Sequence, residues 1–275
     1  MIYGNNYLPE REILAEYITG INSRIILPRI AKARDAQSNR TRNKAEVFTP
    51  LWICNAQNNL VDEQWFGRSD VFNISDNKKW NAFSEKIVFP TKNNKTWKDY
   101  VRAKRLEFTC GEAPYLVSRY DTVSGEIINE LIQRIGVLDR KLRIVDENTD
   151  DYTNWFKWVK KAYQSTYGYE YQGDNLLIAR TNLLYTFCDY LSAKFNRKAY
   201  VSELKQIANI ISWNIWQMDG LTYTSPYSNT TIKEQTWQMT IFEEEVETST
   251  EYAVPCVVRD WSAKCYVEFR SLINK

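Results

Sequence analysis

The sequence predicts an α/β protein built on a doubly wound, largely parallel sheet. Between residues 105 and 219, short strand-like segments alternate with longer helical ones, and this alternation is typical of βαβ units. The chain has 275 residues, of which 44% are hydrophobic and 25% charged. Such a composition is ordinary for a globular protein, and the length suits one domain with added segments.

The chain is expected to divide into an N-terminal helical segment, residues 1–60, and an α/β core, residues 61–275. In the first part, residues 8–34 have the apolar spacing of a helix, which Pro28 interrupts or restarts. Residues 37–44 are polar and basic and predict a loop.

The next elements lead into the core. Residues 51–61 predict a helix whose inward face carries four side chains, Leu51, Cys54, Leu60 and Val61. Residues 67–100 are rich in Asn and Lys and predict irregular structure before a helix near residues 97–104. Residues 105–109 then predict a short strand that runs into a turn at residues 110–112.

Residues 117–165 are expected to be an insertion, because they make the connection to the next strand about twice as long as a normal βαβ crossover. Their apolar spacing predicts amphipathic helices at residues 127–138 and 155–162. Acidic residues at 146–151 predict a loop and the start of the second helix, where carboxylates suit the helix dipole.

The most regular part of the chain follows. Residues 165–170 predict a strand, and Asp174 is expected to cap a long helix. A second helix at residues 202–212 leads to a strand at residues 213–218. Near the C-terminus, residues 250–270 predict a hairpin with strands at 254–258 and 266–269 joined by a turn at 261–264, and the sequence does not place it in the sheet.

Residue counts exclude several classes of site. The chain contains 0 His, which removes histidine as a general base or metal ligand, and we expect no metal site. Its 5 Cys form no C-x-x-C pair and favour reduced thiols in a cytoplasmic protein. No signal sequence is expected, because the N-terminus has no basic region followed by an apolar one, and no membrane-spanning segment is expected, because no apolar run reaches the ~18 residues that span a bilayer.

Net charge is only +2, but basic residues concentrate in residues 24–44, where they are opposed only by Asp35. Clustered Lys and Arg can neutralise phosphates, so this stretch is a candidate nucleic-acid contact; a solvated surface is the alternative. The 10 Trp and 18 Tyr can stack on bases, although aromatic rings more often fill a core. The candidate nucleic-acid-binding residues are Arg29, Lys32, Arg34, Arg40, Arg42 and Lys44.

Three acidic residues stand at the ends of the predicted strands. Glu107 precedes the first turn, Glu170 ends the second strand, and Asp219 follows the third. Ligands of doubly wound sheets bind at the carboxyl ends of the strands. The acids are therefore candidates for binding the polar groups of a nucleoside cofactor, although each alone would more often be a solvated carboxylate.

Four short motifs occur in one order along the chain: Phe48-Thr49-Pro50, the turn Glu107-Phe108-Thr109-Cys110-Gly111-Glu112-Ala113, Tyr167-Gly168-Tyr169-Glu170, and Asp219-Gly220-Leu221. In this order they resemble the modification (M) subunits of bacterial restriction systems, which are adenine-N6 DNA methyltransferases. The resemblance covers roughly residues 44–221. It implies a Rossmann-like fold that binds S-adenosylmethionine.

The resemblance also implies roles for the motif residues. Phe48, Thr49 and Pro50 would pack against the methionine part of the cofactor. Glu107, Cys110 and Gly111 would form the turn that approaches it. Glu170 would hold the ribose and Asp219 the adenine.

Two departures from the family pattern concern the first turn and the catalytic motif. Ala113 replaces the second glycine of the turn and Pro114 follows it, which affects how closely backbone approaches a ligand. The sequence contains no Pro-Pro dipeptide for the catalytic loop. The nearest candidate is Ser225-Pro226-Tyr227, in which Ser225 would orient the adenine amine and Tyr227 would stack on a flipped base; a surface turn is the alternative.

These observations lead to one hypothesis and two alternatives. The first is an S-adenosylmethionine-dependent DNA (adenine-N6) methyltransferase-like protein of restriction-modification type, acting on DNA with a partner subunit for target recognition. Direct methyl transfer needs positioning rather than an acid–base pair, which fits the lack of His. The second is a catalytically inactive relative that binds DNA, cofactor or protein in defence or regulation. The third is a different enzyme that acts on another nucleotide through the same scaffold.

Overall fold

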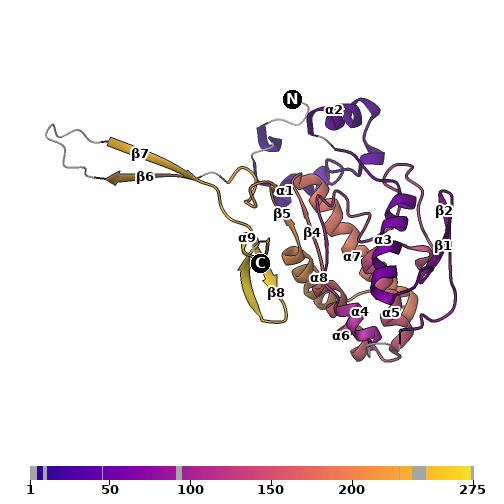
Figure 1. Cartoon of the computed structure of the whole chain (residues 1–275). Coiled ribbons are helices and arrows are strands. Elements are labelled where there is room, and N and C mark those ends of the chain that lie inside the picture. The colour runs from indigo at the N-terminus through magenta and orange to yellow at the C-terminus, as the bar shows by residue number, and fades with distance from the viewer. Residues whose placement is uncertain are drawn as a thin grey trace. The chain divides into compact units, whose positions relative to one another are not determined.

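The computed structural model describes residues 5–8, 11–44, 46–90, 95–228, 230–236 and 246–273. The chain divides into two compact units, and Figure 1 labels the elements of both. The core unit comprises Leu14–Trp216. The terminal unit comprises Met1–Ile13 together with Gln217–Lys275.

A parallel three-stranded sheet lies at the centre of the fold. Its strands are β3 (Arg105–Glu107), β4 (Thr166–Glu170) and β5 (Ile215–Gln217), in the spatial order β3-β4-β5. In the register of the first pair, Arg105 lies opposite Thr166. The predicted strands and the α/β class are thereby confirmed, with β3 and β5 shorter than expected. In the described part of the chain, each strand of this sheet pairs with the next one along the sequence, so both crossovers run the same way across the sheet. The reversal of direction that defines a doubly wound sheet stays a prediction.

Helices fill both crossovers of the sheet. The first crossover carries α5 (Val137–Asn148) and α6 (Tyr152–Gln164), and the second carries α7 (Gly173–Phe195) and α8 (Val201–Asn214). The predicted helices at 155–162 and 202–212 are therefore confirmed. Asp151 caps α6 by accepting the N–H of Asn154 at 2.9 Å, as an acid at a helix start should.

The helix expected at residues 127–138 is wrong. Residues 127–136 are irregular apart from the 3₁₀ turn η5 (Leu131–Gln133), and α5 begins ten residues after the predicted start. It takes in Asp146 and Glu147, whereas Asp150 and Asp151 lie in the predicted loop and helix start. The physical reason is that backbone N–H groups of this segment donate to acceptors outside it. Ile128 donates to the carbonyl of Arg119 at 2.9 Å, and Ile135 donates to Ser118 Oγ at 2.7 Å, so these N–H groups are not available for a helix.

The expectations for the N-terminal segment are also wrong. Up to residue 33, the described residues of this stretch form only α1 (Ala15–Ile18) and the 3₁₀ turns η2 (Gly20–Asn22) and η3 (Arg29–Ala31), because Gly20 has a φ of 59° and Pro28 cannot continue a helix. The predicted loop at 37–44 is instead the helix α2 (Arg34–Lys44). Ion pairs with the core, described below, support this polar helix where propensity alone would not.

Helix α3 (Leu51–Phe66) confirms the predicted helix and is five residues longer. Gly67, with a φ of 71°, ends it. Its inward face differs from the prediction. Leu51 and Cys54 are buried, but Leu60 and Val61 are exposed. Between Cys54 and the buried Phe66, the buried positions of this face are polar, namely Asn55, Asn58 and Asp62.

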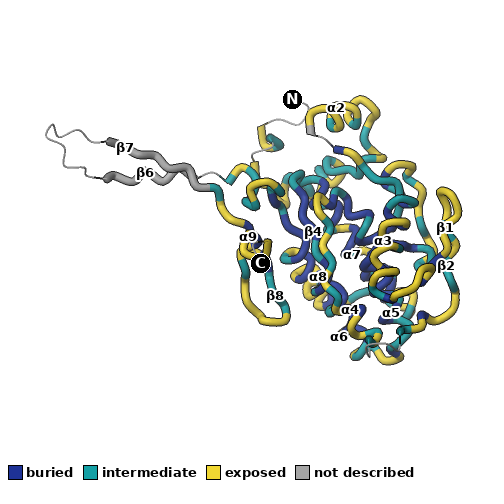
Figure 2. Tube along the Cα trace, viewed as in Figure 1, coloured by how far each residue is buried: buried dark blue, intermediate teal, exposed yellow. Residues whose placement is uncertain are grey.

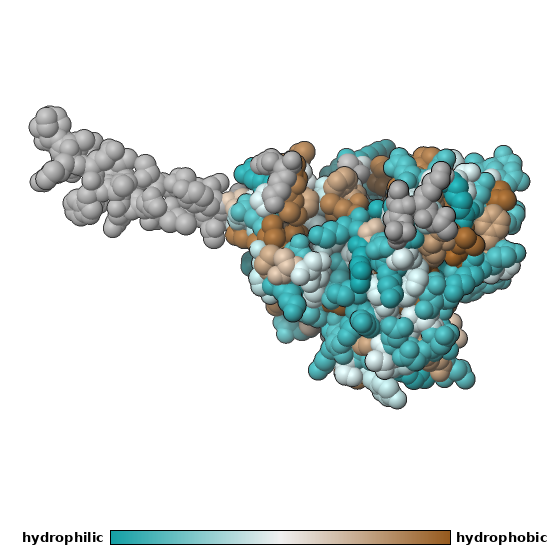
Figure 3. Space-filling model, turned by 60° about the horizontal axis from the view of Figure 1, so that its bottom comes forward, coloured by the Kyte–Doolittle hydropathy of each residue, from teal (hydrophilic) through white to brown (hydrophobic). Residues whose placement is uncertain are grey.

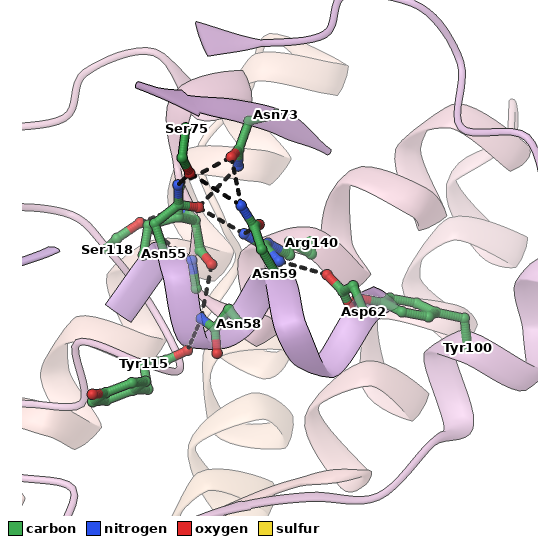
Figure 4. Close-up of polar contacts among 12 residues, drawn as sticks. Asn55, Asn58, Asn59, Asp62, Asn73, Ser75, Tyr100, Tyr115, Ser118 and Arg140 are labelled. Atoms are coloured by element: carbon green, nitrogen blue, oxygen red, sulfur yellow. Dashed lines mark hydrogen bonds and ion pairs between the residues drawn. The ribbon is translucent and has the colours of Figure 1, made fainter. Parts of the chain in front are cut away.

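The polar face of α3 is buried because Arg140 of α5 binds it (Figure 4). The Arg140 guanidinium donates to Asp62 at 2.5 Å, to Asn55 at 2.8 Å and to Asn59 at 2.7 Å. Tyr100 adds a hydroxyl donor to Asp62 at 2.7 Å. A buried charge is stable only with such partners, so this network determines which face of α3 points inward.

Residues 67–100, expected to be irregular, contain a hairpin of β1 (Asn73–Asp76) and β2 (Lys79–Ala82). Asn73 holds the hairpin on α3 by exchanging side-chain hydrogen bonds of 3.0 and 2.9 Å with Asn55. The expected helix near 97–104 is confirmed as α4 (Trp97–Arg102), which begins with a capping box of Thr96 and Asp99.

The terminal unit is built from hairpins. The predicted C-terminal hairpin is confirmed as β8 (Val257–Asp260) and β9 (Cys265–Glu268), whose turn Asp260 stabilises by accepting the N–H groups of Ser262 and Ala263. A second hairpin pairs β6 (Thr230–Thr236) with β7 (Val246–Tyr252). The unit also contains η1 (Asn5–Tyr7) and α9 (Arg270–Ile273); the acidic residues at 243–245 lie outside the described residues.

Buried residues follow the strands and the inner helix faces of the core unit, while its outer surfaces are exposed (Figure 2). On the face drawn in Figure 3, hydrophilic residues cover more of the coloured surface than hydrophobic residues do. In the part of the chain that the structure describes, no helix is both long and apolar enough to cross a bilayer.

A charge pair stabilises the start of α8. Glu203 accepts hydrogen bonds from Arg197 at 2.6 and 3.0 Å and from the backbone N–H of Tyr200 at 2.7 Å. These bonds, against the opposing effect of burial, lower the pKa of Glu203 to about 2.

Replacing Arg140 by Met should lower the free energy of unfolding by about 3–5 kcal/mol, because Asp62 is then a buried charge without its partner. Urea unfolding at pH 7 measures this. Lys205→Met, on the exposed side of α8, is the control and should change stability by under about 0.5 kcal/mol. A loss at Arg140 no larger than that of the control would contradict the role of the network.

Glu203→Gln should cost about 1–3 kcal/mol at pH 7, the usual value of hydrogen bonds to a charged group. Because the folded-state pKa is lowered to about 2, the contribution is fully present above pH 4.5 and is lost as the pH falls from there toward 2. Unfolding of wild type and variant at pH 7, 4.5 and 3 should show a narrowing gap. A gap independent of pH would mean that the carboxylate charge contributes nothing.

Candidate functional site

Three segments that are far apart in the sequence meet at the carboxyl ends of β3 and β4. The ring of Phe48, which precedes α3, packs on Gly111 so closely that a Cβ at Gly111 would lie 3.4 Å from its Cε1 atom. The N–H of Gly111 donates to Glu170 Oε2 at 2.8 Å, and the N–H of Gln172 donates to Oε1 at 3.0 Å. The structure therefore brings one residue from each of the first three motifs into a continuous set of contacts.

The turn after β3 has an unusual backbone. Thr109, Gly111 and Ala113 all have positive φ angles, of 48°, 54° and 66°. Only glycine adopts this left-handed region at no steric cost. Ala113 occupies the position at which the sequence resemblance places a second glycine, so the backbone there has a conformation that favours glycine although the side chain is alanine. The turn is otherwise tied to β4, since the N–H of Cys110 donates to the carbonyl of Tyr169 at 2.8 Å.

Thr49 and Pro50 connect this turn to the start of α3. The carbonyl of Thr49 accepts a hydrogen bond from Thr122 Oγ1 at 3.4 Å, and Pro50 occupies the N-cap position. Pro50 has no side chain to cap the helix, and Asp121 supplies the missing acceptor by binding the N–H of Leu51 at 2.8 Å. Residues 119–122 thus hold the Phe-Thr-Pro segment in place.

Glu107 lies beneath the turn with a buried carboxyl group. Its Oε2 atom has no hydrogen-bonding partner among the described residues. Burial, reinforced by the nearby charge of Glu170, raises the pKa of Glu107 well above its usual value, although the backbone N–H groups of Tyr115 and Leu116 act in the opposite direction. The same environment raises the pKa of the Cys110 thiol.

Further carboxylates surround the turn. Glu112 is buried and accepts the N–H of Arg29 and the hydroxyl of Tyr120, each at 2.6 Å. Burial raises the pKa values of Glu112 and Glu170. Glu46 also lies near this turn, since its charge contributes to both shifts.

Asp174 completes this acidic set, and its predicted role as a helix cap is wrong. Gln172 is the N-cap of α7, and Asp174 lies one residue into the helix. Its carboxylate instead binds Lys32 Nζ at 3.2 Å and Arg40 Nη2 at 3.0 Å. Although burial alone would raise the pKa of Asp174, these two cations hold it below its usual value.

The arrangement favours some ligands over others. A phosphate-binding turn leaves its backbone N–H groups free for an anion, whereas here the N–H of Gly111 is taken by Glu170. Phosphates would also lie close to the charges of Glu46, Glu170 and Asp174, and like charges at short range repel. The site is therefore suited to a neutral or positively charged ligand.

The structure does not gather the predicted nucleic-acid-binding residues on one face. Lys32 and Arg40 turn inward to Asp174, and the Arg29 guanidinium lies over the Phe48 ring, 5.4 Å from its centroid. Arg34 and Arg42 are exposed, and the side chain of Lys44 lies outside the described residues.

The remaining predicted site residues belong to the terminal unit. Asp219 Oδ1 accepts the N–H groups of Leu221 at 2.8 Å and Thr222 at 3.3 Å, and so stabilises the turn that follows β5. Ser225 donates its N–H to the carbonyl of Val254 at 2.9 Å. Pro226 and Tyr227 form a turn in which Tyr227 is 52% exposed with a φ of 57°.

The sequence reasoning missed several residues of the site, in particular Glu46, Glu112, Tyr120, Asp121 and Asp174 in these roles. Glu112 lies inside the turn motif itself, which was a usable signal. Nothing in the sequence marked Glu46 or Asp121 as a site residue, because a single acidic residue in a polar segment is usually exposed to solvent.

No protein-family model, curated protein or solved structure matches the chain. The site is therefore interpreted from its own geometry.

Thr109→Gly should raise the free energy of unfolding by roughly 1 kcal/mol. A β-branched residue in the left-handed region stores ~1–3 kcal/mol of strain, and the greater chain entropy of glycine in the unfolded state offsets part of the gain. Thr109→Ala keeps a Cβ in the same conformation and is the control, expected to gain less. Equal stability of both variants, measured in urea, would refute strain at this position.

Proposed function

We propose that the protein is an S-adenosylmethionine-binding, DNA (adenine-N6) methyltransferase-like protein of restriction-modification type, with a Rossmann-like core. One observation carries the proposal: Gly111 binds Glu170 and lies beside the ring of Phe48 at the carboxyl ends of two parallel strands, and the three residues come from three motifs in family order. Ligands of parallel α/β sheets bind at that edge.

The charge of the site supports the same ligand class. S-adenosylmethionine carries a positive sulfonium and an amino group and has no phosphate, which suits a site with several carboxylates and an occupied turn N–H. A nucleotide with a phosphate chain is disfavoured by the same groups. This weighs against the alternative of a nucleotide-phosphate enzyme on the same scaffold.

The residues that would hold the cofactor can be assigned from their remaining hydrogen-bonding capacity. Each oxygen of Glu170 accepts one backbone N–H and keeps a second lone pair for a ribose hydroxyl. The unpartnered Oε2 of Glu107 is an acceptor for a donor on the ligand. Phe48, Thr49 and Pro50 would pack on the methionine part beside Cys110 and Gly111.

When bound, the cofactor supplies an electrophilic methyl group. The work of the chain would be to hold the adenine amine of DNA in line with it, which requires positioning and not proton transfer by an acid–base pair. Ser225 and Tyr227 are the proposed contacts to the target base. The five cysteines are all unpaired, which agrees with a cytoplasmic location.

A second candidate is a catalytically inactive relative that keeps the cofactor site and acts through DNA or a protein partner. It is favoured by the terminal unit, where Asp219 already satisfies two turn N–H groups and the Ser225 backbone is paired with Val254. Methyl transfer to DNA from radiolabelled cofactor separates the two candidates once binding is established.

Calorimetric titration with S-adenosylmethionine and S-adenosylhomocysteine tests the cofactor site. We expect micromolar binding of both and no binding of ATP. Phe48→Ala and Glu170→Gln should each weaken binding about tenfold or more, by losing a packing surface and an acceptor of ribose hydroxyls.

Glu130→Gln, an exposed acid outside the site, is the matched control and should bind like wild type. Absence of binding at millimolar cofactor, or equal affinities in all variants, would overturn the assignment. Circular dichroism of each variant verifies that the fold is retained.

A further inference from the structure

The segment of residues 29–44, here called the strap, contains η3 and α2 and lies on the candidate site. In Figure 1 it is the indigo segment at the top of the core unit, above β4 and α7. It contacts the site at three places, which are Phe48, Glu112 of the turn and Asp174. The Arg29 guanidinium covers the ring of Phe48, and the Arg29 N–H binds Glu112 of the turn at 2.6 Å.

The other contacts of the strap are ionic. Lys32 and Arg40 both pair with Asp174, which follows β4, and Arg40 also pairs with Glu46. The side chains of Lys32, Arg40 and Asp174 are 13%, 20% and 25% exposed. Ion pairs that reach solvent in this way are screened by salt and compete with other anions.

The outward side of the same helix is basic and accessible. Arg34 and Arg42 are exposed, and neither is drawn into the pairs with Asp174 or Glu46. Arg34 follows Lys32 by two residues and Arg42 follows Arg40 by two, so a polyanion bound to the two arginines lies a short length of chain from both paired cations. Its phosphates then compete with Asp174 and Glu46 for the same cations.

We propose that the strap is a lid over the candidate site and that a nucleic-acid duplex opens it. The closed lid is the state described above, with two cations of the strap bound to Asp174 and Glu46. Duplex phosphates take up these cations and uncover Phe48, the turn and Glu170. The identity of the ligand admitted rests on the proposed function, whereas the opening of the lid does not.

Coupling of this kind is reciprocal. If a duplex favours the open lid, a ligand that needs the open lid must raise the affinity for the duplex by the same factor. Four of the six predicted nucleic-acid-binding residues then have separate roles: Arg34 and Arg42 bind the duplex first, and Lys32 and Arg40 leave their carboxylate partners.

The Lys32–Asp174 pair provides a direct readout, because a carbodiimide joins an amine and a carboxylate at 3.2 Å without a spacer. The yield of this cross-link, measured by peptide mass spectrometry on the full chain, reports the closed lid. A duplex of about 20 base pairs should lower the yield about tenfold at low salt, and an uncharged dextran should not. An unchanged yield with the duplex present in excess overturns the proposal.

Ligand entry is tested with variants of Asp174 and of the two cations that it binds. Asp174→Asn should bind S-adenosylhomocysteine several-fold more tightly than wild type, because it removes the acceptor that closes the lid. Asp35→Asn, an exposed acid on the same helix, is the control. The double variant Lys32→Gln, Arg40→Gln should reproduce the gain if Asp174→Asn does not fold.

Folded variants that bind the ligand no better than wild type show that the strap does not limit entry, and refute the lid. If wild type and variants alike bind no cofactor, the proposed function fails, and the cross-linking result alone decides whether a duplex opens the strap.

Discussion

The candidate site depends on one carboxylate, Glu170, which binds the backbone of two loops at once. Its two oxygens accept the N–H groups of Gly111 and Gln172, so the turn after β3 and the turn after β4 share one acceptor. Because the carboxylate is buried, losing either bond would leave a polar group unsatisfied at considerable cost. The left-handed angles of Thr109 and Ala113 persist next to this bond, which indicates that tertiary hydrogen bonding sets the turn geometry and local preference does not.

The rest of the core unit is organised around buried polar groups to an unusual degree. Helix α3 turns Asn55, Asn58 and Asp62 inward and leaves Leu60 outside, which an apolar stripe would not do. Arg140 makes this possible by donating to three side chains of that helix. Buried networks of this type specify one packing, since any rotation of the helix would leave a charge without a partner.

Those features explain which parts of the fold and site were predictable. Strands β3, β4 and β5 and helices α6 and α8 follow from local apolar patterns. Gly111 does lie beside Phe48 and bind Glu170, but the cofactor roles that the motifs imply stay predictions. Helix α2 and the true start of α5 were not predictable, because distant partners determine them. The inward face of α3 was missed for the same reason: the partner of Asp62 lies 78 residues away.

That separation has a consequence for biosynthesis. Residues 51–66 leave the ribosome well before Arg140 exists, and until then the polar face of α3 has no partner to bury it. At translation rates of about 5–20 residues per second, the 78 intervening residues take about 4–16 s. The N-terminal third of the nascent chain therefore stays open during this interval, and the strap cannot settle on the site before α7 has also emerged to supply Asp174.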